Sequence, residues 1–281
     1  MIKRALAAAA LLSLGACSSA PRDPVAPYQS AAAAEAKSAQ EDYGGGQIGG
    51  AILSLRDSVR LRLAGGDLPG AARSELNLAL AERASGDSAA AAAAASRLRE
   101  LTPGAVQQAR EQGGTAGAGR EAELEDSSSW LDALLALDQG DTALAQSRAP
   151  GRDGQLAANS QMRARIETLH AAIALSGGRF AEAGDLARAG RAASIEAGDP
   201  PEEAHACALA GAAHMGSGAW IEARADYLAA VRIEERIGGG TRMALDLRQL
   251  AVISGRLGDG ATARLYTGRA DAIQSSGADG R

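Results

Sequence analysis

Apolar residues recur every three or four positions along most of the chain, which is the spacing of one face of an α-helix. The clearest stretch is 162–273, where one turn pattern occurs three times as LSGGRFAEA, MGSGAWIEA and GRLGDGATA. The turn glycines of these copies are Gly178, Gly218 and Gly258, which lie 40 residues apart. A fixed period of about 20–50 residues indicates a stacked repeat array. The pattern therefore predicts an all-α protein in which each copy is a helical hairpin.

The segment before this array has the same periodicity but a less regular spacing. Three helices are predicted within 50–103, the last of them at 88–101 and ended by Pro103. The turn glycines of this segment lie only 20 residues apart, so the pairing of the three helices is ambiguous. The pairing of 71–84 with 88–101 fits best.

Composition divides the rest of the ordered region. Residues 104–128 are rich in Gly, Glu and Ser with little to bury, so they are predicted to be a mobile insertion or linker, with some helix around 105–112 as the alternative for its first part. Residues 129–158 then predict a short hairpin whose open end Trp130 covers. Three 40-residue repeats follow at 159–275, and the polar tail 276–281 is expected to be disordered.

The first 16 residues have the organisation of a secretory signal. Lys3 and Arg4 precede an uncharged apolar run over 5–14, which is too short to cross a membrane as a mature helix. The run ends in LGAC, which resembles the lipobox of bacterial lipoproteins. The resemblance implies a signal peptide at 1–16 and lipidation of Cys17, including palmitate. An ordinary secretory signal with a chance cysteine is the alternative.

Residues 17–49 are predicted to form a lipid-anchored flexible tether. Three prolines in its first half favour an extended chain, and runs of glycine break the remainder. Ser18 stands directly after the cysteine, and the lipoprotein resemblance then implies the outer membrane, facing the periplasm. The inner membrane and the cell surface are the alternatives.

Charge and core composition narrow the classes of partner. The formal net charge is −5 and would become −7 once the signal is removed with its two cations. Nucleic-acid binding depends on cationic side chains that neutralise phosphates, so no nucleic-acid partner is expected. Only 2% of residues are aromatic, and an alanine-rich core buries little apolar area. We therefore expect a modest stability that rises when a partner binds.

The repeats resemble the tetratricopeptide repeat (TPR) family, whose hairpins have a small residue in the first helix and an alanine, an aromatic and another alanine in the second. The positions that carry the resemblance are Gly178, Ala183, Gly211, Gly218, Ala223, Tyr227, Ala230, Gly258, Ala263 and Ala270. Two copies lack the aromatic, with Ala187 and Thr267 in its place. The resemblance implies an α-solenoid of TPR-like helical hairpins; a generic alanine-rich helical bundle is the alternative.

A TPR superhelix lines its concave surface with the first helix of each hairpin. The resemblance thus implies a candidate partner-binding groove formed by Arg165, Thr168, His205, Met215 and Arg248. Arginine binds carboxylates through two parallel hydrogen bonds, which suits an acidic or C-terminal segment of a partner. The Lys/Asn carboxylate clamp of the chaperone-binding TPR proteins does not occur in this sequence, so that activity is not implied.

No group of residues points to chemistry. Cys207 and His214 share a helix face but lie two turns, about 10 Å, apart, which is too far for one metal ion. No catalytic-serine, phosphate-loop or zinc-protease motif occurs. We expect neither enzymatic activity nor a metal or other cofactor.

The sequence thus predicts a membrane-anchored periplasmic scaffold that binds other envelope proteins, and by analogy one that assembles a pilus or a secretin. An adaptor or regulator of a cell-wall enzyme, or of polysaccharide export, is the alternative. The identity of the partner and the oligomeric state stay open.

Overall fold

The computed structural model describes residues 25–152, 160–238 and 240–278, and the regular secondary structure in these ranges is helical. The predicted all-α class is confirmed. The helices are α1 (Ala26–Gly44), α2 (Ile48–Ala64), α3 (Leu68–Ser85), α4 (Ser88–Asp138), α5 (Thr142–Arg148), α6 (Ser160–Ser176), α7 (Phe180–Ala197), α8 (Pro200–Gly216), α9 (Trp220–Ile237), α10 (Gly240–Arg256) and α11 (Gly260–Ala278).

Short turns of one kind join most of these helices. Each has a glycine with φ between 63° and 87°, a region that costs glycine little because it has no Cβ. These glycines are Gly46, Gly66, Gly86, Gly140, Gly178, Gly198, Gly218, Gly238 and Gly258. Five turns continue with an aspartate that caps the next helix by accepting a backbone N–H. These caps are Asp67, Asp87, Asp141, Asp199 and Asp259.

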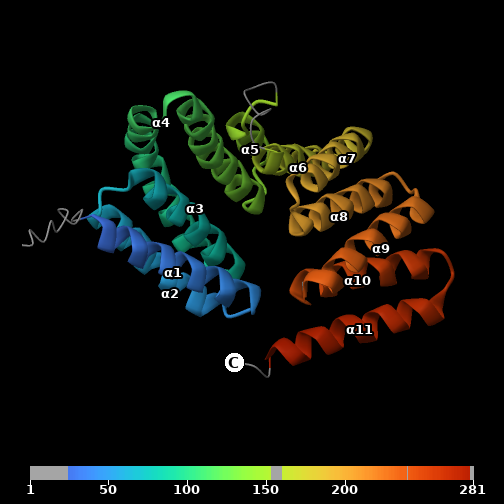
Figure 1. Cartoon of the computed structure of the whole chain (residues 1–281). Coiled ribbons are helices and arrows are strands. Elements are labelled where there is room, and N and C mark those ends of the chain that lie inside the picture. Colours follow the sequence, from blue (N-terminus) through green and yellow to red (C-terminus); the bar gives the residue numbers. More distant parts are fainter. Residues whose placement is uncertain (1–24, 153–159, 239, 279–281) are drawn as a thin grey trace, which may run out of the picture.

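Consecutive helices pack as hairpins, α1 with α2, α6 with α7, α8 with α9 and α10 with α11. Each hairpin also contacts the next one along the chain, so that α7 lies on α8 and α9 lies on α10. Figure 1 shows the hairpins following one another in a curved row, with α1 and α2 at one end and α11 at the other.

Helix α4 folds back on itself. Arg99 pairs with Asp132 at 3.3 Å, and Arg110 pairs with Glu121 at 2.9 Å. In a straight helix these pairs would be separated by about 50 Å and 16 Å. The chain therefore reverses between 110 and 121, and we call 88–110 the first arm and 121–138 the second arm. Figure 1 shows the two arms of α4 (green) descending from their junction. The first arm packs on α3 and the second arm continues into the hairpin with α5.

The predicted linker at 104–128 is wrong, because both arms of α4 extend into it. Ala105, Val106 and Leu124 from this segment are buried. Pro103 does not end the helix, although it removes one backbone hydrogen bond. The next turn of the same helix contacts the loop between α2 and α3. Gln108 donates to the carbonyl of Gly66 at 2.7 Å and accepts from the N–H of Leu68 at 2.8 Å.

The predicted tether at 17–49 is wrong for the part that the structure describes. Helix α1 occupies 26–44 and packs on α2, with Ala32 and Ala39 buried. Ser58 of α2 donates to the carbonyl of Ala32 at 3.1 Å. The sequence offers α1 few large apolar residues, but its alanines allow close approach to the neighbouring helix. Residues 1–24, with the signal and Cys17, lie outside the described residues.

The sequence also predicts the helix pairing in the first half of the chain and the end of the last helix. The pairing of 71–84 with 88–101 is confirmed by α3 and the first arm of α4, where Arg97 binds Glu75 at 2.7 Å. Helix α11 continues to Ala278, so the first part of the predicted tail 276–281 is helical. Among the described residues, no helix is long and apolar enough to span a membrane.

A candidate protein-binding cavity

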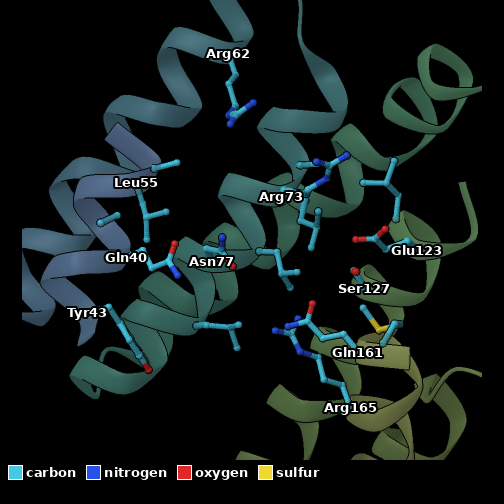
Figure 2. A pocket seen from close by; sticks show the side chains of 18 of the residues that line it. Gln40, Tyr43, Leu55, Arg62, Arg73, Asn77, Glu123, Ser127, Gln161 and Arg165 are labelled. Carbon is cyan, nitrogen blue, oxygen red and sulfur yellow. The ribbon is translucent and has the colours of Figure 1, made fainter. Parts of the chain in front are cut away.

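A cavity of about 720 Å³ opens in the N-terminal half of the molecule. Most of its lining comes from α1, α3, the second arm of α4 and α6, each of which is the first helix of a hairpin. Figure 2 shows side chains from these successive hairpins converging on one space. Four hairpins are therefore needed to form the cavity.

The floor of the cavity is apolar. It consists of Leu55, Leu76, Leu80, Leu98, Leu124 and Met162. Most of these side chains are largely buried, because they also pack in the core between the hairpins. A floor of this kind can bury apolar side chains at about 25 cal/mol per Å² of area removed from water.

The walls are polar and carry more positive than negative charge. Lys37, Arg73 and Arg165 line the cavity, together with the single carboxylate Glu123. A fourth cation, Arg62, forms an ion pair of 2.6 Å with Asp67, and Lys37 forms one of 3.6 Å with Glu41; both carboxylates lie outside this lining. Gln40 and Asn77 supply uncharged donors and acceptors, whereas Gln161 donates its amide N–H to Asp199 at 2.9 Å.

Arg165 is oriented by its neighbours. Trp130 of the second arm donates its indole N–H to the Arg165 carbonyl at 3.0 Å. The guanidinium lies 5.8 Å from the centre of the same indole ring, which is the range of a cation–π contact. This pairing holds the side chain at the cavity while its N–H groups remain available to a ligand. Trp130 is therefore buried where the second arm of α4 meets α6. The sequence predicts instead that it covers the open end of a short hairpin.

Thr168, which the sequence places in the groove, is a buried contact between hairpins. It is 2% exposed and donates to Glu202 of α8 at 2.5 Å. Its methyl group would lie 2.8 Å from a Cβ at Gly190, so it fills the space that this glycine leaves. Burial raises the pKa of Glu202, partly opposed by the Thr168 hydrogen bond and by the charge of Arg165. Thr168 therefore joins two hairpins and cannot face a partner.

His205 is also outside the cavity lining. Burial lowers its pKa to about 3, and the nearby charges of Arg242 and Arg83 act in the same direction. The imidazole is therefore neutral at physiological pH and cannot contribute a cation to a binding groove.

The other two predicted groove residues also lie elsewhere. Met215 is half-buried against the core of the last two hairpins. Arg248 reaches across its own hairpin, donating to Asp271 at 3.2 Å and to Gln274 at 2.6 Å. Of the five groove candidates, only Arg165 lines the cavity. The other four lie outside its lining. Burial excludes Thr168 from contact with a partner, and a partner-binding role of Met215 and Arg248 elsewhere stays a prediction.

The predicted repeat positions lie at turns and helix contacts. Gly178, Gly218 and Gly258 are turn glycines with positive φ. A Cβ at Gly211 would lie 2.7 Å from the ring of Tyr227, so these two residues let α8 and α9 approach closely. The alanines at these positions are Ala183, Ala223, Ala230 and Ala270, which are buried, and Ala263, which is half-buried.

One buried polar pair has no counterpart in the sequence-based interpretation. Glu234 of α9 and Asp246 of α10 are 1% and 5% exposed, and both Glu234 carboxylate oxygens lack a hydrogen-bond partner among the described residues. Burial raises the pKa of Glu234 to about 8 and that of Asp246 to about 7; the charge of Asp246 raises the Glu234 value further, and Arg242 opposes both shifts. The sequence could have revealed this pair, because Glu234 and Asp246 stand at positions of their helices where the periodic pattern predicts a buried apolar residue.

The chain matches no protein-family model, and no curated protein is similar to it. Within the part of the chain that the structure describes, no three His, Cys, Asp or Glu side chains are grouped to hold a metal ion. The cavity geometry is thus the direct guide to function.

Proposed function

We propose that this protein is a TPR-like α-solenoid scaffold that binds a segment of another protein in the cavity. The observation that supports this most is the origin of the lining, in which first helices of four successive hairpins face one space. TPR proteins line their concave surface in the same way. An apolar floor with polar walls suits a protein segment, which brings both apolar side chains and backbone hydrogen-bonding groups.

The anchor completes the proposal. The LGAC sequence ends an apolar run of signal-peptide length, so we propose lipidation of Cys17 and attachment to the outer membrane, facing the periplasm. Two or more acyl chains hold a protein firmly, whereas a single chain binds only marginally. The scaffold would then collect a partner at the membrane, for example during assembly of a pilus or a secretin. The alternative function, in which the protein regulates a cell-wall enzyme or polysaccharide export, would use the same cavity to bind its partner.

Site-specific photo-crosslinking of the full chain in its own cells tests the cavity. A photoreactive side chain replaces Asn77, which is exposed on the cavity wall, or Ala181, which is exposed on α7 away from it. We expect one envelope protein to be attached from position 77 and not from 181, and the purified pair to repeat the crosslink. Equal crosslinking from both positions, or none from 77, would contradict binding in the cavity.

A further inference from the structure

We infer that the cavity selects an acidic, amphipathic segment of its partner, in which apolar side chains meet the leucine floor and carboxylates meet Arg73 and Arg165. This inference rests on the proposed function and adds the chemistry of the ligand. Figure 2 shows Arg73 on α3 and Arg165 on α6 reaching into the same space from different helices.

Arg73 and Arg165 differ from most arginines near them in forming no ion pair among the described residues, although the charge of Arg165 acts on the buried carboxyl of Glu202. Arg62, Arg83, Arg97, Arg99 and Arg110 all form ion pairs within the protein. For Arg73 and Arg165, no ion pair is found among the residues that the structure describes. Arg73 is exposed, so its guanidinium keeps its full hydrogen-bonding capacity for a ligand.

The charge at the cavity opposes that of the whole chain. The protein carries a net charge of −5, yet Arg73 and Arg165 outnumber the cavity carboxylate Glu123 even when the paired cations Lys37 and Arg62 are left aside. Arginine forms two parallel hydrogen bonds with a carboxylate, which adds direction to the electrostatic attraction. A cationic segment would meet repulsion from these groups, and a neutral one would leave them without partners.

The floor excludes a purely charged ligand. Covering leucine and methionine side chains with a polyacid would desolvate charge without burying apolar area, which is unfavourable. An amphipathic segment satisfies both surfaces, because its apolar residues cover the floor and its acidic residues remain at the walls. Gln40 and Asn77 can then bond its backbone.

Selection from a randomised peptide library on the purified full chain tests the inference. We expect the peptides retained by the native protein to be enriched in Asp and Glu together with Leu, Ile or Phe. With the Arg73→Gln/Arg165→Gln variant, the acidic enrichment should disappear while the apolar enrichment persists. A peptide chosen on the native protein should bind this variant about tenfold more weakly, since two partly exposed charge pairs are lost.

The matched control is Arg188→Gln/Arg264→Gln, which removes two exposed arginines that do not line the cavity. It should retain the native preference, and circular dichroism should show the same helix content for all three proteins. Peptides without an acidic excess, or an acidic excess that survives in Arg73→Gln/Arg165→Gln, would overturn the inference and leave the proposed function standing. Recovery of no peptide by the native protein would contradict the proposed function itself.

Discussion

We expect the buried carboxyls of Glu234 and Asp246 to make the stability of the α9–α10 junction depend on pH. Both carboxyls are shielded from water, and the hydrogen bonds that would stabilise their charged forms are missing for both Glu234 oxygens within the described structure. Their pKa values of about 8 and about 7 mean that the folded protein holds protons that the unfolded chain releases near its ordinary pKa values. As the pH rises from the ordinary carboxyl pKa values to about 8, this pair should therefore lower the free energy of unfolding.

The perturbation that isolates this effect is Glu234→Gln, which replaces the protonated carboxyl by a neutral group of the same shape. The variant has no proton to lose on unfolding, so its advantage grows with pH. Each unit by which a pKa is raised corresponds to about 1.4 kcal/mol. The rise from 4.5 to about 8 therefore sets a ceiling of about 4–5 kcal/mol. We expect a gain in the free energy of unfolding of about 2–4 kcal/mol near pH 8 and close to none near pH 5.

The assay is urea unfolding of the native protein and the variant at several pH values, followed by circular dichroism. Only the difference between the two proteins is diagnostic, because His205 acts in the opposite direction. Its lowered pKa means that the unfolded chain gains a proton first as the pH falls, which destabilises the fold in acid. That contribution is the same in both proteins and cancels in the difference.

The neighbouring substitution Glu235→Gln is the control. Glu235 is exposed and pairs with Arg269 at 2.7 Å, so its loss should change the free energy of unfolding by less than about 1 kcal/mol at every pH. A gain for Glu234→Gln that is equal near pH 5 and near pH 8 would refute the reasoning, since it would show that the carboxyl ionises normally in the folded protein.

Two further predictions concern packing. Gly211→Ala should lower the melting temperature, because its Cβ would lie 2.7 Å from the Tyr227 ring and overpacking costs about 1–3 kcal/mol. The control is Gly255→Ala, whose Cβ would meet no atom within 4 Å, so it should be neutral or stabilising by up to about 1 kcal/mol. A loss of equal size at both glycines, measured by thermal unfolding, would rule out the ring contact as its cause. Cys207 should resist iodoacetamide at pH 8 until denaturant is added, because it is 3% exposed and burial raises its pKa to about 11. Peptide mapping by mass spectrometry checks this, and rapid labelling of the folded protein would count against that burial.

Helices and turns could be predicted from the sequence because the interactions that determine them are local. The glycine at each turn adopts positive φ, and at five of the turns an aspartate caps the next helix through a backbone N–H three residues further on. Both choices depend on neighbouring residues alone. The all-α class and the turns at Gly178, Gly218 and Gly258 follow from them.

The tertiary structure decided which segments pack and which side chains face the cavity. Helix α1 has few large apolar residues of its own and is held by its packing on α2. Helix α4 continues past Pro103, and Gln108 then bonds to the turn between α2 and α3. Thr168 and Arg165 are three residues apart on α6, yet one is buried against α8 and the other lines the cavity. Periodicity defines a helix face, but the position of neighbouring hairpins determines whether that face meets protein or solvent. The sequence alone therefore determined the repeating hairpin, and only the packing of four hairpins created the cavity.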